Sequence, residues 1–191
     1  MKELLARVRA CRLCEAALPL GPRPVVHASG TARVLIIGQA PGTKVHETGI
    51  PWNDASGIRL REWLGLDPAA FYDESRIAIM PMGFCYPGRL PQGGDAPPRP
   101  ECAPTWHAAL RTEMPEIRLT LLVGSYAQAR YLGRGAMTEH VRRQPGAPSV
   151  WALPHPSWRN TAWMARHPWF AAEVLPPLRA ALHGVLDQTR L

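Results

Sequence analysis

Four short apolar runs alternate with helical patterns along this chain. The runs lie at residues 33–38, 76–82, 118–123 and 149–153. Helical patterns lie at residues 1–10, 58–64, 103–113, 124–132 and 169–187. Runs of branched aliphatic residues without polar alternation are typical of strands that are buried on both faces of a parallel sheet. The alternation therefore predicts the α/β class, as a three-layer αβα sandwich with a central four-stranded parallel sheet.

Two of these apolar runs end in loops rich in glycine, proline and polar residues. The first run leads into Gly38-Gln39-Ala40-Pro41-Gly42, and the last into Pro154-His155-Pro156-Ser157. Ligands of open α/β sheets bind at the carboxyl ends of the strands, so these loops are the first candidates for a functional site. The first loop lacks the Lys-Ser/Thr of a P-loop and the third glycine of a dinucleotide fingerprint, so neither nucleotide motif fits.

Length and charge narrow the class of protein. A chain of 191 residues is expected to form a single domain, residues 1–191. Without a long apolar run or an apolar signal core, we expect a cytoplasmic protein with no membrane partner. A net charge of +7, nearly all from arginine, favours a polyanion such as nucleic acid, although genome composition alone could also enrich arginine.

Four cysteines form a pattern typical of a metal site. They are Cys11, Cys14, Cys85 and Cys102. Without a secretory signal, a disulfide framework is disfavoured. The Cys-x-x-Cys pair and two later cysteines beside a Pro- and Gly-rich loop favour a four-thiolate site, which zinc and iron–sulfur clusters both accept. Four unrelated buried thiols are the alternative.

The two strand-end motifs, with cysteines between them, resemble a known family. Gly38-Gln39-Ala40-Pro41-Gly42 and His155-Pro156-Ser157 are similar to the two signature motifs of the uracil-DNA glycosylase superfamily, most closely its iron–sulfur branch. The resemblance extends from Cys11 to about Trp169. It implies a DNA repair enzyme that hydrolyses the N-glycosidic bond of deoxyuridine in uracil-containing DNA. It also implies a [4Fe–4S] cluster on the four cysteines, with zinc as the alternative.

The resemblance assigns roles to residues near the first motif. Backbone groups of the family motif touch the pyrimidine and orient the attacking water; the corresponding residues here are Gly38, Gln39, Ala40 and Gly42. Some members have an aspartate that activates water where this chain has Ala40. We therefore expect His46 or Asp54 to take the place of this aspartate in catalysis, as the residue that activates the attacking water. Trp52 aligns with an aromatic residue that stacks on the flipped base, and Asn53 is a candidate for reading the base edge.

The resemblance also assigns roles to the second motif. His155 matches the histidine that donates a hydrogen bond to a uracil carbonyl and stabilises the leaving anion. Ser157 would contact a phosphate, while Trp158 and Arg159 stand where the family inserts a wedge into the duplex. Asn160 completes the predicted DNA-binding set. We expect the protein to be a monomer. We also expect it to leave the DNA strand intact, because no lysine is placed to form a Schiff base.

One residue departs from the family pattern. Pro81 stands near the end of the second apolar run, where the family usually has an asparagine that reads the uracil edge. Base recognition then depends on backbone groups or Asn53, or the specificity has changed. A DNA-binding module of the same fold, which recognises a modified base with weak or no turnover, is therefore the alternative function. A small-molecule hydrolase using His155 and Ser157 ranks last, because the chain has no Gly-x-Ser-x-Gly elbow.

Overall fold

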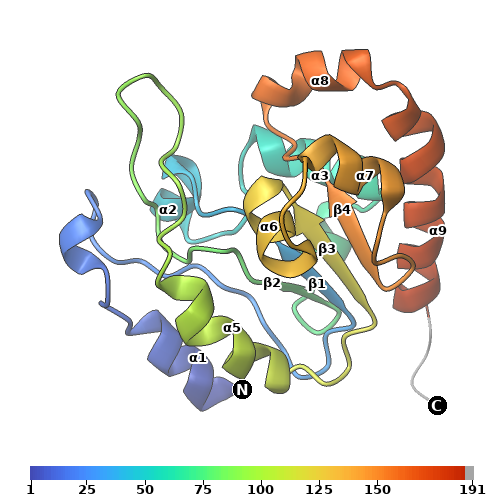
Figure 1. Cartoon of the computed structure of the whole chain (residues 1–191). Helices are drawn as coiled ribbons and strands as arrows, with labels where there is room; N and C mark the ends of the chain where they lie inside the picture. Colours follow the sequence, from blue (N-terminus) through green and yellow to red (C-terminus); the bar gives the residue numbers. More distant parts are fainter. Residues whose placement is uncertain (188–191) are drawn as a thin grey trace.

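A four-stranded, all-parallel sheet forms the centre of the computed structural model, which describes residues 1–187. Its strands are β1 (Val34–Ile37), β2 (Ile77–Ile79), β3 (Leu119–Val123) and β4 (Val150–Leu153). They lie in the order β2-β1-β3-β4, with Leu35 opposite Ala78 on one side and Thr120 on the other. The four predicted strands and the predicted three-layer sandwich are confirmed (Figure 1).

Helices form the two outer layers. They are α1 (Lys2–Arg9), α2 (Thr43–Thr48), α3 (Ala55–Leu64), α4 (Pro68–Phe71), α5 (Cys102–Thr112), α6 (Ser125–Leu132), α7 (Met137–Arg143), α8 (Thr161–Arg166) and α9 (Leu175–Leu186). Short 3-10 turns occupy Glu15–Ala17 and Trp158–Asn160. The predicted helix over 169–187 is divided, because a π-helical turn (Phe170–Val174) precedes α9.

One face of the sheet packs against α3, α7 and α9. Successive side chains of a strand point to opposite faces, so Val34 and Ile36 of β1 both reach this layer. They are fully buried with Leu60 of α3 and Leu178 of α9. Leucines at helical spacing along α9 make its buried stripe: Leu175, Leu178, Leu182 and Leu186.

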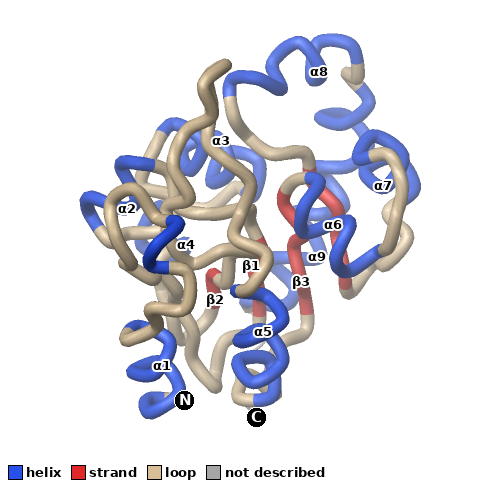
Figure 2. The backbone as a smooth tube through the Cα atoms, turned by 60° about the vertical axis from the view of Figure 1, so that its left-hand side comes forward, coloured by secondary structure: helices blue, strands red, loops and turns tan. Residues whose placement is uncertain are grey.

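The other face packs against α1, α5 and α6. Leu35 and Ile37 are buried there with Val8 of α1, Leu110 of α5 and Ala127 of α6. Helices α1 and α5 lie side by side (Figures 1 and 2), which brings the residues after α1 close to the start of α5.

The chain crosses the sheet on opposite faces before and after β2. The connection from β1 to β2 runs through α3, and the connection from β2 to β3 runs through α5 on the other face. Connections that diverge in this way open a crevice outside the carboxyl ends of the strands. Strand β2 ends at Ile79, earlier than expected, because Pro81 has no N–H group for a ladder. No helix within residues 1–187 is long and apolar enough to cross a lipid bilayer.

Candidate active site

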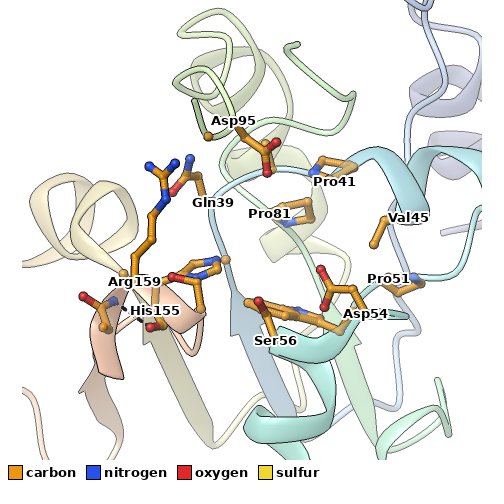
Figure 3. Close-up of a pocket in the computed structure, with 18 of the residues that line it drawn as sticks. Gln39, Pro41, Val45, Pro51, Asp54, Ser56, Pro81, Asp95, His155 and Arg159 are labelled. Carbon is orange, nitrogen blue, oxygen red and sulfur yellow. Dashed lines mark hydrogen bonds between the residues drawn. The ribbon is translucent and has the colours of Figure 1, made fainter. Parts of the chain in front are cut away.

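The carboxyl ends of all four strands open into one pocket of about 510 Å³ (Figure 3). Each strand contributes a residue that lines it just beyond or near its end: Gly38 after β1, Pro81 after β2, Gly124 after β3 and His155 after β4. The two motif loops predicted from the sequence therefore meet at a single site.

Backbone contacts hold the first motif loop against the end of β2. The N–H of Met82 donates to the Gly38 carbonyl (2.9 Å), and the N–H of Gly83 donates to the Gln39 carbonyl (3.0 Å). Gly38 must lack a side chain, because a Cβ there would lie 2.7 Å from a ring carbon of Trp52. Gln39, like the neighbouring Ala40 and Gly42, lines the pocket.

Trp52 is held in an uncommon backbone conformation beside His155. Its φ of 56° lies in the left-handed region, which a bulky residue occupies only where the surroundings impose it. The Trp52 carbonyl accepts hydrogen bonds from the Tyr72 hydroxyl (3.3 Å) and Arg61 Nη1 (3.4 Å). A Cβ on Gly57 would collide with this carbonyl oxygen, so the glycine is required. The Trp52 ring lies 5.5 Å from the His155 ring, tilted by 35°.

Hydrogen bonds to carbonyl groups fix the His155 loop. Asn160 Nδ2 donates to the His155 carbonyl (2.7 Å). Arg59 Nη1 donates to the carbonyls of Pro156 (3.3 Å) and Ser157 (3.2 Å). Arg59 was not predicted as a site residue, because its role depends on a loop distant in the sequence. Asn160, predicted to bind DNA, also stabilises this loop.

The environment of the imidazole favours its neutral form. Burial lowers the pKa of His155 below its ordinary value, and the Asp54 carboxylate opposes this shift. A neutral imidazole can still donate one hydrogen bond to a carbonyl oxygen. The arrangement therefore suits a donor that needs no protonation.

Two carboxylates reach the pocket beside Gly42. Asp54 begins α3 and accepts a hydrogen bond from the Gly57 N–H through Oδ1 (2.8 Å). Its Oδ2 lies 4.0 Å from the place that a Cβ on Gly42 would occupy, and Asp95 Oδ2 lies 3.6 Å from that place. Burial raises the pKa of Asp95, and the Asp54 charge raises it further. Asp95 was not predicted, because it stands in a Pro- and Gly-rich loop that offers no periodic pattern.

The Arg159 side chain contacts both Trp158 and the loop that contains Gly94. The Trp158 side chain is 76% exposed, with the Arg159 guanidinium over its ring at 5.6 Å. The guanidinium also packs on the backbone of Gly94, where a Cβ would collide with both of its terminal nitrogens. Ser157 and both of these residues line the pocket.

Two residues predicted for the site lie outside the pocket lining. His46 is on α2, and its ring faces that of Tyr86 at 6.1 Å between centroids. Asn53 Nδ2 donates to Thr48 Oγ1 (3.4 Å). Of the two candidates for the partner of the water, only Asp54 lines the pocket.

The four cysteines are free thiols that gather at one place. Cys11 and Cys14 follow α1, Cys85 follows β2, and Cys102 begins α5. The thiol of Cys14 interacts with that of Cys102, and Cys85 lies within electrostatic reach of the other three cysteines. Burial is the main reason that the pKa values of two of these thiols rise, to about 12 for Cys85 and about 11 for Cys102. Across residues 1–187, no group of three His, Cys, Asp or Glu side chains is placed to bind a single metal ion.

A comparison with protein families agrees with this site. The family model described as "Uracil DNA glycosylase superfamily" matches residues 25–179. That range includes every residue that lines the pocket and two of the four cysteines. Because the match covers most of the chain and both pocket motifs, this chain belongs to the uracil DNA glycosylase superfamily, a family of DNA-acting glycosylase hydrolases.

Proposed function

We propose that this protein is a monofunctional DNA glycosylase that hydrolyses the N-glycosidic bond of a flipped-out deoxyuridine. The observation that carries the proposal is the placement of Trp52 and His155, whose rings lie 5.5 Å apart in the pocket formed by both motif loops. A nucleotide must leave the base stack to react, so the pocket needs an aromatic surface and a polar group for the base. Trp52 and His155 supply these two functions.

The proposed chemistry depends on charge stabilisation. As the bond between C1′ and N1 breaks, negative charge develops on the uracil ring and positive charge on the sugar. The neutral imidazole of His155 donates to a uracil carbonyl oxygen, where this negative charge accumulates. The Asp54 carboxylate lies on the other side of the pocket, where it can stabilise the sugar and orient a water (Figure 3).

Pro81 offers the base no hydrogen-bonding group. A proline has no N–H, and the Pro81 carbonyl accepts a hydrogen bond from His107 Nε2 (3.0 Å). The other ring nitrogen of His107, Nδ1, accepts from the Tyr131 hydroxyl (2.7 Å). Recognition of the uracil edge would therefore fall to Gln39 and to the backbone of the first motif. This apolar wall is also the observation that favours the second candidate, a DNA-binding module without turnover.

We also propose that Cys11, Cys14, Cys85 and Cys102 hold a [4Fe–4S] cluster, with zinc as the alternative. Four free thiols from two distant segments lie within electrostatic reach of one another, which supports this proposal, and binding a metal centre would draw the thiols closer together. Burial raises the pKa values of Cys14, Cys85 and Cys102, so their thiolates need a compensating positive charge, which a metal centre supplies. The bound group would act as a structural cross-link between the N-terminal segment and the loop from Cys85 to Cys102.

A single-turnover assay tests the proposed function. A uracil-containing oligonucleotide is incubated with excess protein, and alkali then cleaves the abasic sites. The wild type should release uracil without breaking the strand, and His155→Ala should lower the rate by about 10²–10³-fold, the usual cost of losing one preorganised donor. His183→Ala, an exposed histidine on α9, is the matched control and should keep the wild-type rate.

Two results would contradict the proposed function. Tight binding of uracil-containing DNA without base release would favour the DNA-binding module. A protein–DNA adduct trapped by borohydride would indicate a Schiff base, with Lys44 as the nearest candidate, and would exclude a purely hydrolytic mechanism.

A further inference from the structure

We propose that Asp95 is a further catalytic residue, which shares with Asp54 the orientation and deprotonation of the attacking water. This inference rests on the proposed function. It concerns a residue of the loop between Cys85 and Cys102, outside both signature motifs.

Gly42 leaves room for a water between the two carboxylates. The place that a Cβ on Gly42 would occupy lies 3.6 Å from Asp95 Oδ2 and 4.0 Å from Asp54 Oδ2. Both carboxylates turn into the pocket from different walls (Figure 3). Any other residue at position 42 would fill the gap between them. A water in this gap would have a carboxylate oxygen on either side.

Hydrogen bonds within its loop and a contact with Arg159 hold Asp95 at the pocket. Residues 88–96 form a hairpin, in which the N–H of Leu90 donates to the Gly94 carbonyl (2.8 Å) and the N–H of Ala96 donates to the Gly88 carbonyl (2.8 Å). At the tip, the Arg159 guanidinium packs on Gly94, directly before Asp95. The His155 loop thus holds the hairpin against the pocket.

In the part of the chain that the structure describes, both carboxylate oxygens of Asp95 are free to bind a water, whereas one carboxylate oxygen of Asp54 already accepts a hydrogen bond. Within residues 1–187, the Asp95 carboxylate has no hydrogen bond or ion pair. The residue as a whole is exposed, but its carboxylate turns into the pocket (Figure 3). Asp54 Oδ1 already caps α3. The charges that face Asp95 are Arg89 and Arg159, which lower its pKa, and Asp54, which together with burial raises it.

The step balances without any further reactant. The water oxygen forms a bond to C1′ as the bond from C1′ to N1 breaks, and the bonding electron pair leaves with the base. The water proton passes to the carboxylate pair, and the sugar keeps the hydroxyl group. His155 stabilises the departing uracil throughout by donating a hydrogen bond, while the two carboxylates orient the water and accept its proton.

Single-turnover rates over a range of pH test the role of Asp95. Asp95→Asn should lower the excision rate by about 10²-fold, at the low end for a general base, because Asp54 remains. The wild-type rate should fall as pH falls through the pKa of Asp95, and this limb should shift or vanish in Asp95→Asn. Added formate should restore part of the rate to Asp95→Ala, where the side chain leaves space, and none to Asp95→Asn. Gln92→Ala, exposed on the same hairpin, should match the wild type.

The outcomes separate this inference from the proposed function. An active wild type whose rate is unchanged in Asp95→Asn would overturn the inference alone. So would a variant that binds uracil-containing DNA more weakly yet reacts at the wild-type rate, because Asp95 would then read the base. A wild type that releases no base would overturn the proposed function and the inference together.

Discussion

The two motif loops and the hairpin of residues 88–96 reach the same pocket by different physical means. The motif loops leave buried strands directly, and backbone hydrogen bonds such as Met82 N–H to the Gly38 carbonyl tie them to neighbouring strand ends. The hairpin has few apolar residues and touches the pocket through Asp95 and the contact of Gly94 with Arg159. Strand ends thus position the motif loops, whereas the hairpin depends on contact with Arg159, a residue distant in the sequence.

Because different contacts hold the two regions, the hairpin can lose its position at the pocket while the sheet stays folded. The motif loops share the stability of the core, because Val34, Ile36 and Leu121 beneath them are fully buried. The hairpin lies within the loop that runs from Cys85 to Cys102, so any cross-link among the cysteines would hold both ends of that loop. Substitutions in the two regions should therefore have separable effects.

The largest effect is expected from Cys85→Ser, which removes one ligand of the proposed cluster. The purified wild type should be brown, with about four irons per chain, and the variant should lose both colour and iron. Thermal unfolding should occur at a clearly lower temperature, because the cross-link between the N-terminal segment and the hairpin is lost. The measurements are iron content and a melting curve. A colourless wild type with one zinc per chain would replace the cluster but keep the cross-link, and a metal-free wild type would exclude both.

A smaller effect is expected from acid, through His107 behind Pro81. Burial lowers the pKa of His107 from 6.5 to about 4 in the folded protein. Between these values the unfolded chain binds more protons, so the free energy of unfolding should decrease as pH falls from about 6.5 to about 4. The loss should reach about 3 kcal/mol, at ~1.4 kcal/mol per pKa unit.

Denaturant unfolding of the wild type and His107→Gln at several pH values measures this contribution. The difference in stability between the two proteins should shrink as pH falls, because only the wild type has the group that stays neutral when folded. The other histidines are common to both proteins and cancel in the comparison. Parallel pH profiles would show that His107 does not resist protonation.

The smallest effect isolates the contact at the tip of the hairpin. Gly93 and Gly94 have nearly the same φ, +89° and +88°, but only a Cβ on Gly94 would collide with the Arg159 guanidinium. Gly93→Ala and Gly94→Ala should thus share a backbone cost of about 1–2 kcal/mol. Gly94→Ala alone should also slow excision, because it displaces Arg159 and with it Asp95. Equal rates in the two variants would mean that this contact does not position the hairpin.

The sequence by itself determined the elements whose information is local. Uninterrupted branched residues identified the four strands, and two motifs at strand ends identified both loops of the pocket, including His155. The family resemblance added Trp52. These predictions succeeded because strand formation depends on near neighbours, and because the carboxyl ends of parallel strands must meet at one edge.

Tertiary structure decided every feature that joins distant segments. Asp95 meets Asp54 across Gly42, and Arg159 meets Gly94, through contacts that no local pattern encodes. His46, which lies on α2 close to the first motif in sequence, instead faces Tyr86 in the loop after β2. Proximity along the chain is a poor guide in loops, since they lack the fixed periodicity that makes a strand or a helix predict where its side chains point.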